Sequence, residues 1–130
     1  LTQICELFAS QESTDNTDLN YYQPKPDDCV IGTGSQQLLT LIADSLFDPG
    51  DIVLVEAPTY LVFRGVLETH GVKVVNLPMD NHGIIPTALQ TILNDLKSQQ
   101  DLPKLKALYT VDFYQNPSNI SLAEDRKEKI

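Results

Sequence analysis

The sequence is poor in cysteine and histidine, and this scarcity excludes small folds held together by zinc or by disulfides. Cys5 and Cys29 are far apart and show no CxxC spacing, and the two histidines are His70 and His82. Neither a zinc site nor a disulfide framework fits four such scattered residues. We therefore expect no metal site, and thiols that stay reduced, as in a cytoplasmic protein.

Basic residues are also few. Nine lysines and arginines stand against eighteen acidic residues, so the net charge is -9 and the chain repels nucleic-acid phosphates and anionic lipid. No apolar run approaches the roughly 20 residues that cross a bilayer, and residues 1–4 lack the basic-then-apolar order of a secretory signal. We expect neither nucleic acid nor membrane as a partner of this segment, and a cytoplasmic location.

The ends of the sequence carry no terminal signals. It begins without methionine, and its last residues, 124–130, are a charged amphipathic stretch without a glycine or proline to stop a helix. With 130 residues, the chain has room for one domain or part of one. We expect both ends to be cut.

Short apolar runs alternate with helical periodicity along most of the chain. Residues 1–28 are expected to form a helix tail, a polar loop and an irregular, proline-bearing lead-in. After them the pattern predicts strands at residues 29–33, 52–55, 72–77 and 105–111, and helices at residues 35–47, 59–70, 86–98 and from about 122. Such alternation is typical of an α/β fold, with three layers and a mainly parallel sheet covered by helices on both faces.

A glycine-rich turn, Gly32-Thr33-Gly34-Ser35, lies between the first predicted strand and helix. Glycines permit a tight turn, and the unsatisfied N–H groups at a helix start attract anions, most often phosphate. A tight turn with Ser35 capping the helix explains the same residues. A dinucleotide site is a further possibility, because Glu56 ends the next strand, but Gln37 occupies the place of the third glycine.

Several motifs in order resemble the fold-type I pyridoxal phosphate aminotransferases, in particular the kynurenine and 2-aminoadipate aminotransferase group. The resemblance spans Val30 to about Arg126 and makes residues 29–130 part of a cofactor-binding large domain, truncated at both ends. The motifs are Gly34-Ser35-Gln36-Gln37, Asp48-Pro49-Gly50-Asp51 with Val53, Glu56-x-Pro58-Thr59-Tyr60, Tyr109-Thr110-Val111 and Gln115-Asn116-Pro117. Ser118-Asn119 departs from the family's usual hydroxyl residue followed by glycine, and residues 112–114 also differ from it.

The resemblance implies roles for four residues. Ser35 and Gln36 would hold the phosphate of pyridoxal 5'-phosphate, Tyr60 would stack on its ring, and Asn116 would hydrogen-bond its phenolic oxygen. Taken singly, Tyr60 is also explained as a half-buried aromatic residue at a helix start, and Asn116 as a turn residue before Pro117. The resemblance also makes Asn116-Pro117 a candidate cis peptide bond.

The same resemblance implies that no catalytic residue lies in this chain. The Schiff-base lysine is expected beyond Ile130, because none of the lysines here has the Ser-x-x-Lys setting of the family. Arg64 and Arg126 are interpreted as exposed or ion-paired, and the two histidines receive no role. The isolated chain is therefore expected to be inactive.

The parent protein implied by the resemblance is a homodimeric enzyme that exchanges an amino group between an amino acid and a 2-oxo acid. Two alternatives remain. One is the aminotransferase-like domain of a winged-helix transcription regulator, and the other is an NAD-binding Rossmann module.

Overall fold

The computed structural model describes residues 25–130, so the predicted helix tail and loop before them lie outside the described residues. Contacts divide the chain into the units Leu1–Thr33 and Gly34–Ile130. In the first unit, Pro26–Asp28 form a short 3-10 helix, η1. The strand predicted at residues 29–33 is wrong, since the segment forms no strand. An apolar run supplies side chains suited to a sheet, but a strand also requires a neighbouring ladder.

The second unit is built on a four-stranded sheet in the order β3-β2-β1-β4. The strands are β1 (Ile52–Ala57), β2 (Lys73–Asp80), β3 (Gly83–Ile84) and β4 (Leu105–Tyr109). Strand β1 pairs in parallel with β2 on one side and β4 on the other, while β3 is antiparallel to β2. The predicted parallel strands are confirmed. The two-residue β3 was not predicted, because so short a strand has no periodicity.

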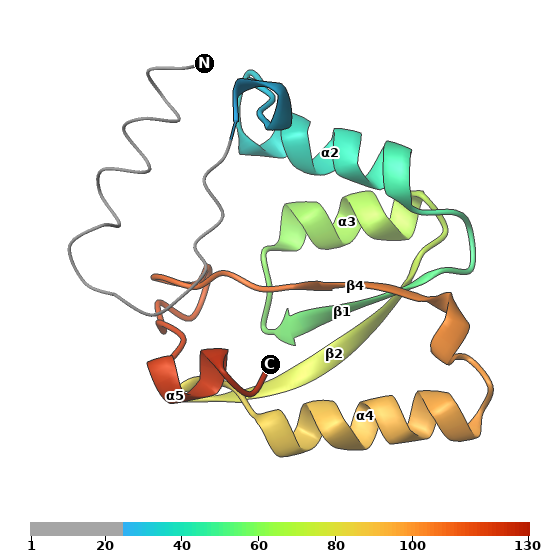
Figure 1. Cartoon of the computed structure of the whole chain (residues 1–130), viewed down its shortest axis with the longest axis vertical. Helices are drawn as coiled ribbons and strands as arrows, with labels where there is room; N and C mark the ends of the chain where they lie inside the picture. Colours follow the sequence, from blue (N-terminus) through green and yellow to red (C-terminus); the bar gives the residue numbers. More distant parts are fainter. Residues whose placement is uncertain (1–24) are drawn as a thin grey trace. The chain divides into compact units, whose positions relative to one another are not determined.

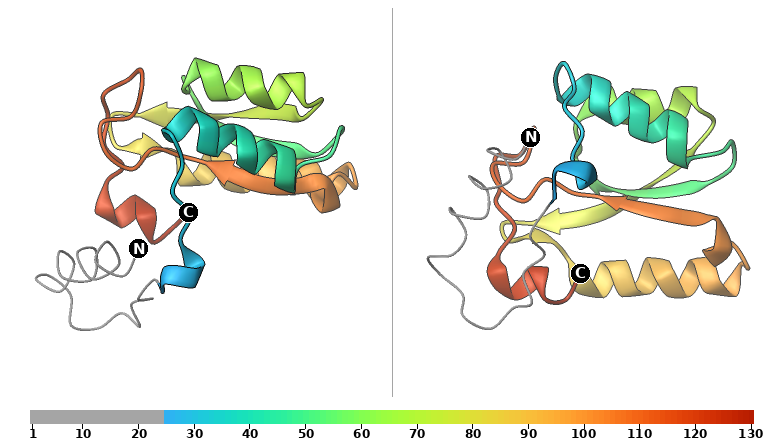
Figure 2. Two further views of the ribbon diagram at one scale, coloured as in Figure 1. Left: turned by 90° about the horizontal axis from the view of Figure 1, so that it is seen from above. Right: turned by 45° about the horizontal axis from the view of Figure 1, so that its top comes forward.

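Helices cover both faces of this sheet, which confirms the three-layer α/β prediction. Helices α2 (Ser35–Leu46) and α3 (Leu61–Thr69) lie side by side on one face, and α4 (Pro86–Ser98) lies on the other (Figures 1 and 2). A 3-10 turn, η2 (Leu102–Lys104), leads into β4. The helix predicted from about residue 122 is short, α5 (Glu124–Lys127). No helix within residues 25–130 is long and apolar enough to cross a bilayer.

Strand β1 supplies two separate cores. Ile52 and Leu54 pack toward α4, whereas Val53 and Val55 pack toward α2 and α3. All four side chains are almost fully buried. Successive side chains of a strand point to opposite faces, so the sequence of a strand that is covered on both sides is an uninterrupted apolar run.

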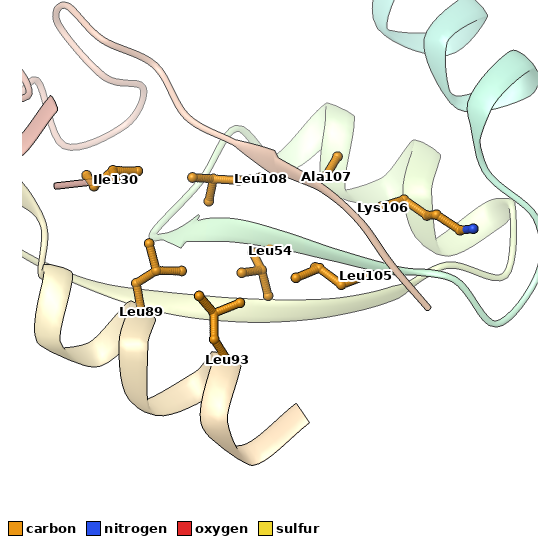
Figure 3. Close-up of a pocket in the computed structure, with 8 residues that line it drawn as sticks. All are labelled: Leu54, Leu89, Leu93, Leu105, Lys106, Ala107, Leu108 and Ile130. Atoms are coloured by element: carbon orange, nitrogen blue, oxygen red, sulfur yellow. The ribbon is translucent and has the colours of Figure 1, made fainter. Parts of the chain in front are cut away.

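An apolar groove lies between α4 and β4. Leu89 and Leu93 of α4 point toward Leu54 and Leu108 of the sheet (Figure 3). The groove lies on the face of the sheet opposite α2 and α3, and the side chains of its floor are aliphatic. Lys106 also lines the groove, and its ammonium group lies 3.8 Å from the Asp51 carboxylate.

The C-terminal segment is fixed to the turn between β2 and β3. Arg126 donates to the Ile84 carbonyl oxygen at 2.7 Å and pairs with Asp80 at 2.8 Å, which lowers the pKa of that carboxyl group. Gly83 has φ +93°, and a Cβ added there would lie 2.6 Å from the Leu122 side chain. The predicted ion-paired state of Arg126 is confirmed, and only glycine fits beneath Leu122.

Candidate functional site

Polar side chains are buried where β1 ends, in contrast to the apolar strand itself. Glu56 is 1% exposed, and its two carboxylate oxygens accept hydrogen bonds from the Thr110 hydroxyl at 2.6 Å and the Val111 N–H at 3.2 Å. Glu56 therefore fixes the segment that follows β4 against the end of β1. With both oxygens engaged inside the chain, it is not placed to bind a ribose, which removes the residue on which the dinucleotide interpretation depended.

A second buried polar residue, Gln115, connects the loop after β4 to the turn after β1. Its side-chain amide donates to the Pro58 carbonyl oxygen at 2.6 Å, and its carbonyl oxygen accepts from the Ser118 N–H at 2.9 Å. Asn116 follows directly and is exposed. The Ala57-Pro58 and Asn116-Pro117 peptide bonds are both cis, so the cis prediction at Asn116 is confirmed.

Tyr60 and Gln36 come together although 24 residues separate them. The Gln36 side-chain amide donates to the Tyr60 hydroxyl at 2.7 Å. Gln36 lies in the first turn of α2, and Tyr60 immediately precedes α3. The contact places the start of α2 beside the carboxyl end of β1, which is where ligands bind in open α/β sheets.

The start of α2 is shaped by glycine. Gly34 precedes the helix with φ +125° and ψ 163°, a conformation essentially restricted to glycine. Gly34 occupies the N-cap position and Ser35 is the first helical residue, so the alternative in which Ser35 caps the helix does not hold. The first-turn N–H groups of Ser35 and Gln36 have no acceptors within the helix, and no acidic residue lies in that turn. This helix start suits an anion.

Aromatic rings support Tyr60 from the sheet side. The ring centroids of Phe63 and Tyr109 are 4.6 Å apart, and Tyr60 packs against the same cluster. Burial, followed by the nearby carboxylate of Glu56 and by Tyr60, raises the pKa of Tyr109. The Tyr109 hydroxyl consequently stays neutral, and the ring contributes packing instead of charge.

A groove runs beside these residues at the end of the sheet. Its lining includes Pro58, Thr59 and Asn76 together with Pro117, which places the peptide after Asn116 next to the turn that leads to Tyr60. The Thr59 hydroxyl is buried and has no hydrogen-bond partner among the described residues. Arg64 also lines the groove, but it is engaged with Glu68 and Asn76 at 2.9 Å each, as its predicted ion-paired state requires.

The structure thus brings three of the four predicted residues, Ser35, Gln36 and Tyr60, to one place, and Gln115 positions the fourth, Asn116, at the neighbouring turn. The roles of Glu56 and Gln115 as buried supports were missed. A polar residue directly after an apolar strand was the available signal for Glu56. Within residues 25–130, no group of three metal-ligating side chains is present.

Comparison with known proteins decides the family. A family model described as aminotransferase class I and II matches residues 3–119. The chain belongs to the class I and II aminotransferases. It is 34% identical over 103 residues to aromatic-amino-acid aminotransferase 1 of Thermococcus litoralis, covering 79% of this chain and 24% of that protein.

A solved aminotransferase structure agrees. The kynurenine aminotransferase of Pyrococcus horikoshii, solved in complex with PMP, superposes with a TM-score of 0.71 at 40% identity, covering 75% of this chain and 24% of that one. A further relative is an uncharacterized HTH-type transcriptional regulator of Bacillus subtilis, 31% identical over 101 residues, with 78% of this chain and 20% of that protein covered. The chain therefore spans about a quarter or less of the length of these relatives.

The class I and II aminotransferases depend on pyridoxal phosphate, and the residues present fit that group. The phosphate requires an uncharged, donor-rich helix start, which α2 provides after Gly34. The ring requires an aromatic surface nearby, which Tyr60 provides. The family's cofactor and the geometry of this site therefore agree.

Proposed function

We propose that this chain forms part of the cofactor site of a pyridoxal phosphate-dependent aminotransferase, which transfers an amino group between an amino acid and a 2-oxo acid. The observation that carries the proposal is the 2.7 Å hydrogen bond between Gln36 and Tyr60. It joins an anion-binding helix start to an aromatic ring at the carboxyl end of the sheet. A phosphate and a flat heterocycle on one molecule match that pair of surfaces.

Ser35 and Gln36 bind the phosphate in this proposal. Their backbone N–H groups have no acceptor within α2, and the positive end of the helix dipole favours the phosphate dianion. The Ser35 hydroxyl adds one further donor. The bound cofactor supplies a conjugated ring that stabilises negative charge developing on the substrate.

Tyr60 and Asn116 orient the ring. The Tyr60 side chain presents an aromatic face, and its hydroxyl is held by Gln36. The Asn116 amide can donate to the phenolic oxygen of the cofactor. Glu56 and Gln115 act through these residues, because they fix the two loops on which Tyr60 and Asn116 lie.

The lysine that bonds to the cofactor is proposed to lie outside this chain, so the isolated chain is inactive. Lys127 is the lysine paired with the loop after β4, and it is held by Asp112 at 3.0 Å and Glu124 at 3.1 Å, which raises the pKa of its ammonium group. A nucleophilic amine requires a lowered pKa. The other lysines among the described ion pairs, Lys73, Lys104, Lys106 and Lys129, also contact aspartates.

The test is absorbance and borohydride trapping of pyridoxal phosphate on the full-length protein, with this chain run alongside. We expect a cofactor band in the full-length protein, a trapped lysine outside residues 1–130, and turnover of amino acids with 2-oxo acids. The isolated chain should give neither trapping nor turnover. Absence of cofactor binding by the full-length protein contradicts the proposal.

A transcription regulator is the second candidate, favoured by the likeness to the HTH-type regulator of Bacillus subtilis. In that case the full-length protein binds pyridoxal phosphate but does not turn over amino donors, and it carries a basic helix-turn-helix segment. A DNA-binding assay with and without the cofactor separates this candidate from the enzyme. Because this chain has a net negative charge, any DNA contact would be made by another part of the protein.

We also propose that the enzyme is a cytoplasmic homodimer. The scarcity of cysteine is consistent with a reducing compartment, and the family resemblance implies active sites that use residues of both subunits. Light scattering on the full-length protein should give the mass of two chains, and a monomeric mass contradicts this part of the proposal.

A further inference from the structure

Helix α2 is tied to its neighbour α3 at both ends. At the start of α2, Gln36 bonds the Tyr60 hydroxyl at 2.7 Å. Near its other end, the Asp44 carboxylate lies 2.6 Å from Nε2 of His70, the residue that follows α3. The two helices lie side by side in each view (Figures 1 and 2). The position of α2, and of its first turn, therefore depends on two polar contacts as well as on the core beneath it.

Both ring nitrogens of His70 face acceptors. Nδ1 lies 2.7 Å from the Val66 carbonyl oxygen, and Nε2 lies 2.6 Å from Asp44 Oδ1. A carbonyl oxygen and an ionised carboxylate can only accept hydrogen bonds, whereas a neutral imidazole has a single N–H. The imidazolium form satisfies both contacts, and the neutral form must leave one acceptor facing a nitrogen lone pair.

The charges around His70 favour that protonated form. The hydrogen bond to Asp44, and after it the bond to Val66, raise the pKa of His70 above its ordinary 6.5. Glu68, on the same helix, is paired with Arg64, and Asp51, in the turn before β1, pairs with a lysine of β4. Among the described residues, Asp44 is thus the carboxylate that acts on the ring.

We propose that Asp44 and His70 form a pH-sensitive tie that positions α2, and through it the phosphate-binding residues Ser35 and Gln36. This inference rests on the proposed function for the identity of the phosphate. Because α2 is one continuous helix from Ser35 to Leu46, a displacement of the end that carries Asp44 also moves its first turn relative to Tyr60. Asp44 and His70 are positioning residues and touch neither cofactor nor substrate.

The direction of the pH effect follows from the raised pKa. The tie contributes fully below the unfolded-state pKa of histidine, near 6.5, and is lost as pH rises through the higher pKa of the folded protein. Helix α2 is therefore held more firmly at mildly acidic than at alkaline pH. Salt should weaken the tie, because the Asp44 side chain is 55% exposed.

The first test measures the tie without the cofactor. In the full-length apoprotein, exchange of the histidine C2 hydrogen, read by mass spectrometry, gives the pKa of His70. We expect this pKa to lie above the ordinary value for histidine in the wild type and to fall in Asp44→Asn. Amide exchange in α2, corrected for its intrinsic pH dependence, should quicken in the wild type as pH rises through the pKa of His70, and should lose this step in His70→Gln. A His70 pKa that Asp44→Asn leaves unchanged, or α2 exchange without the step, overturns the inference.

The second test asks whether the tie reaches the phosphate site. The dissociation constant of pyridoxal phosphate is measured for the wild type, Asp44→Asn and His70→Gln, with His82→Gln as the matched histidine control. Near pH 6 both tie variants should bind about threefold more weakly than the wild type, an effect in the range of exposed ion pairs, and near pH 8.5 the ratio should approach one. If the ratio of variant to wild-type dissociation constants does not change with pH, the positioning role is overturned. If neither the wild type nor any variant binds the cofactor, the proposed function is contradicted, and the contact between Asp44 and His70 is then tested by the exchange experiment alone.

Discussion

Within β1 the sheet is held by apolar side chains, whereas from the last residues of the strand onward it is held by buried polar ones. Ile52 to Val55 form two aliphatic cores, and Glu56 then receives a hydroxyl and an N–H from the segment after β4. Apolar burial is not directional, so the two cores do not require contacts of fixed geometry. The polar contacts have fixed geometry, so they can set the positions of Tyr60 and Asn116 closely enough to bind a ligand. Substitutions in the two regions should therefore have different consequences.

The largest loss of stability is expected in the aliphatic core. Leu54→Ala removes a side chain that is 1% exposed and packs against α4, at a cost of about 2–5 kcal/mol in the free energy of unfolding. Denaturant unfolding of the full-length protein measures it, with Lys97→Ala on the exposed side of α4 as the control. A loss no greater than that of the control would contradict the central place of β1 in the core.

Replacing the buried carboxylate should cost less stability and disturb the site more. Glu56→Leu keeps the size of the side chain but leaves the Thr110 hydroxyl and the Val111 N–H unpaired, at a cost of about 1–3 kcal/mol. Glu56→Gln retains an acceptor and should lose less. Amide exchange of residues 110–116 should rise in the order wild type, Gln variant, Leu variant; equal exchange in all three would show that Glu56 does not fix this loop.

The link between the two loops should affect cofactor binding. Gln115→Glu removes the donor to the Pro58 carbonyl oxygen and sets a charge against it, so Asn116 should lose its fixed position. We expect pyridoxal phosphate to dissociate about tenfold faster, as a loss near 1.4 kcal/mol predicts. Stopped-flow release of the cofactor measures it, with Gln90→Glu on the exposed side of α4 as the control. Unchanged release would separate Gln115 from the site.

The smallest effect is expected from removing a single hydroxyl. Tyr60→Phe keeps the ring but loses the bond from Gln36, a contact of about 0.5–1.5 kcal/mol, so the free energy of unfolding should fall by about that amount and cofactor affinity roughly threefold. Tyr60→Leu, which loses the aromatic face as well, should bind more weakly still. Equal affinity in the two variants would mean that the ring does not stack on the cofactor.

The sheet interior could be predicted from the sequence because buried elements have a characteristic pattern of apolar residues. The apolar run at residues 52–55 and the helical spacing of residues 86–98 became β1 and α4 with nearly the predicted bounds. The run at residues 29–33 has the same local character and is not a strand, since a strand depends on a partner that local sequence does not specify.

The site was only partly predictable, for a physical reason. Ser35, Gln36, Tyr60 and Asn116 were predicted through motifs, but the buried bonds of Glu56 and Gln115 join residues more than 50 positions apart. The Asp44–His70 contact was missed in the same way, since only the packing of α2 on α3 brings the two together. Hydrogen-bond partners at such separations follow from the fold and leave no periodic trace.

The most direct test of the central claim is a crystal structure of the full-length protein with pyridoxal phosphate. We expect the phosphate oxygens to lie within hydrogen-bonding distance of the backbone N–H groups of Ser35 and Gln36, with the pyridine ring stacked on Tyr60. A phosphate bound elsewhere, with the first turn of α2 unengaged, would contradict it.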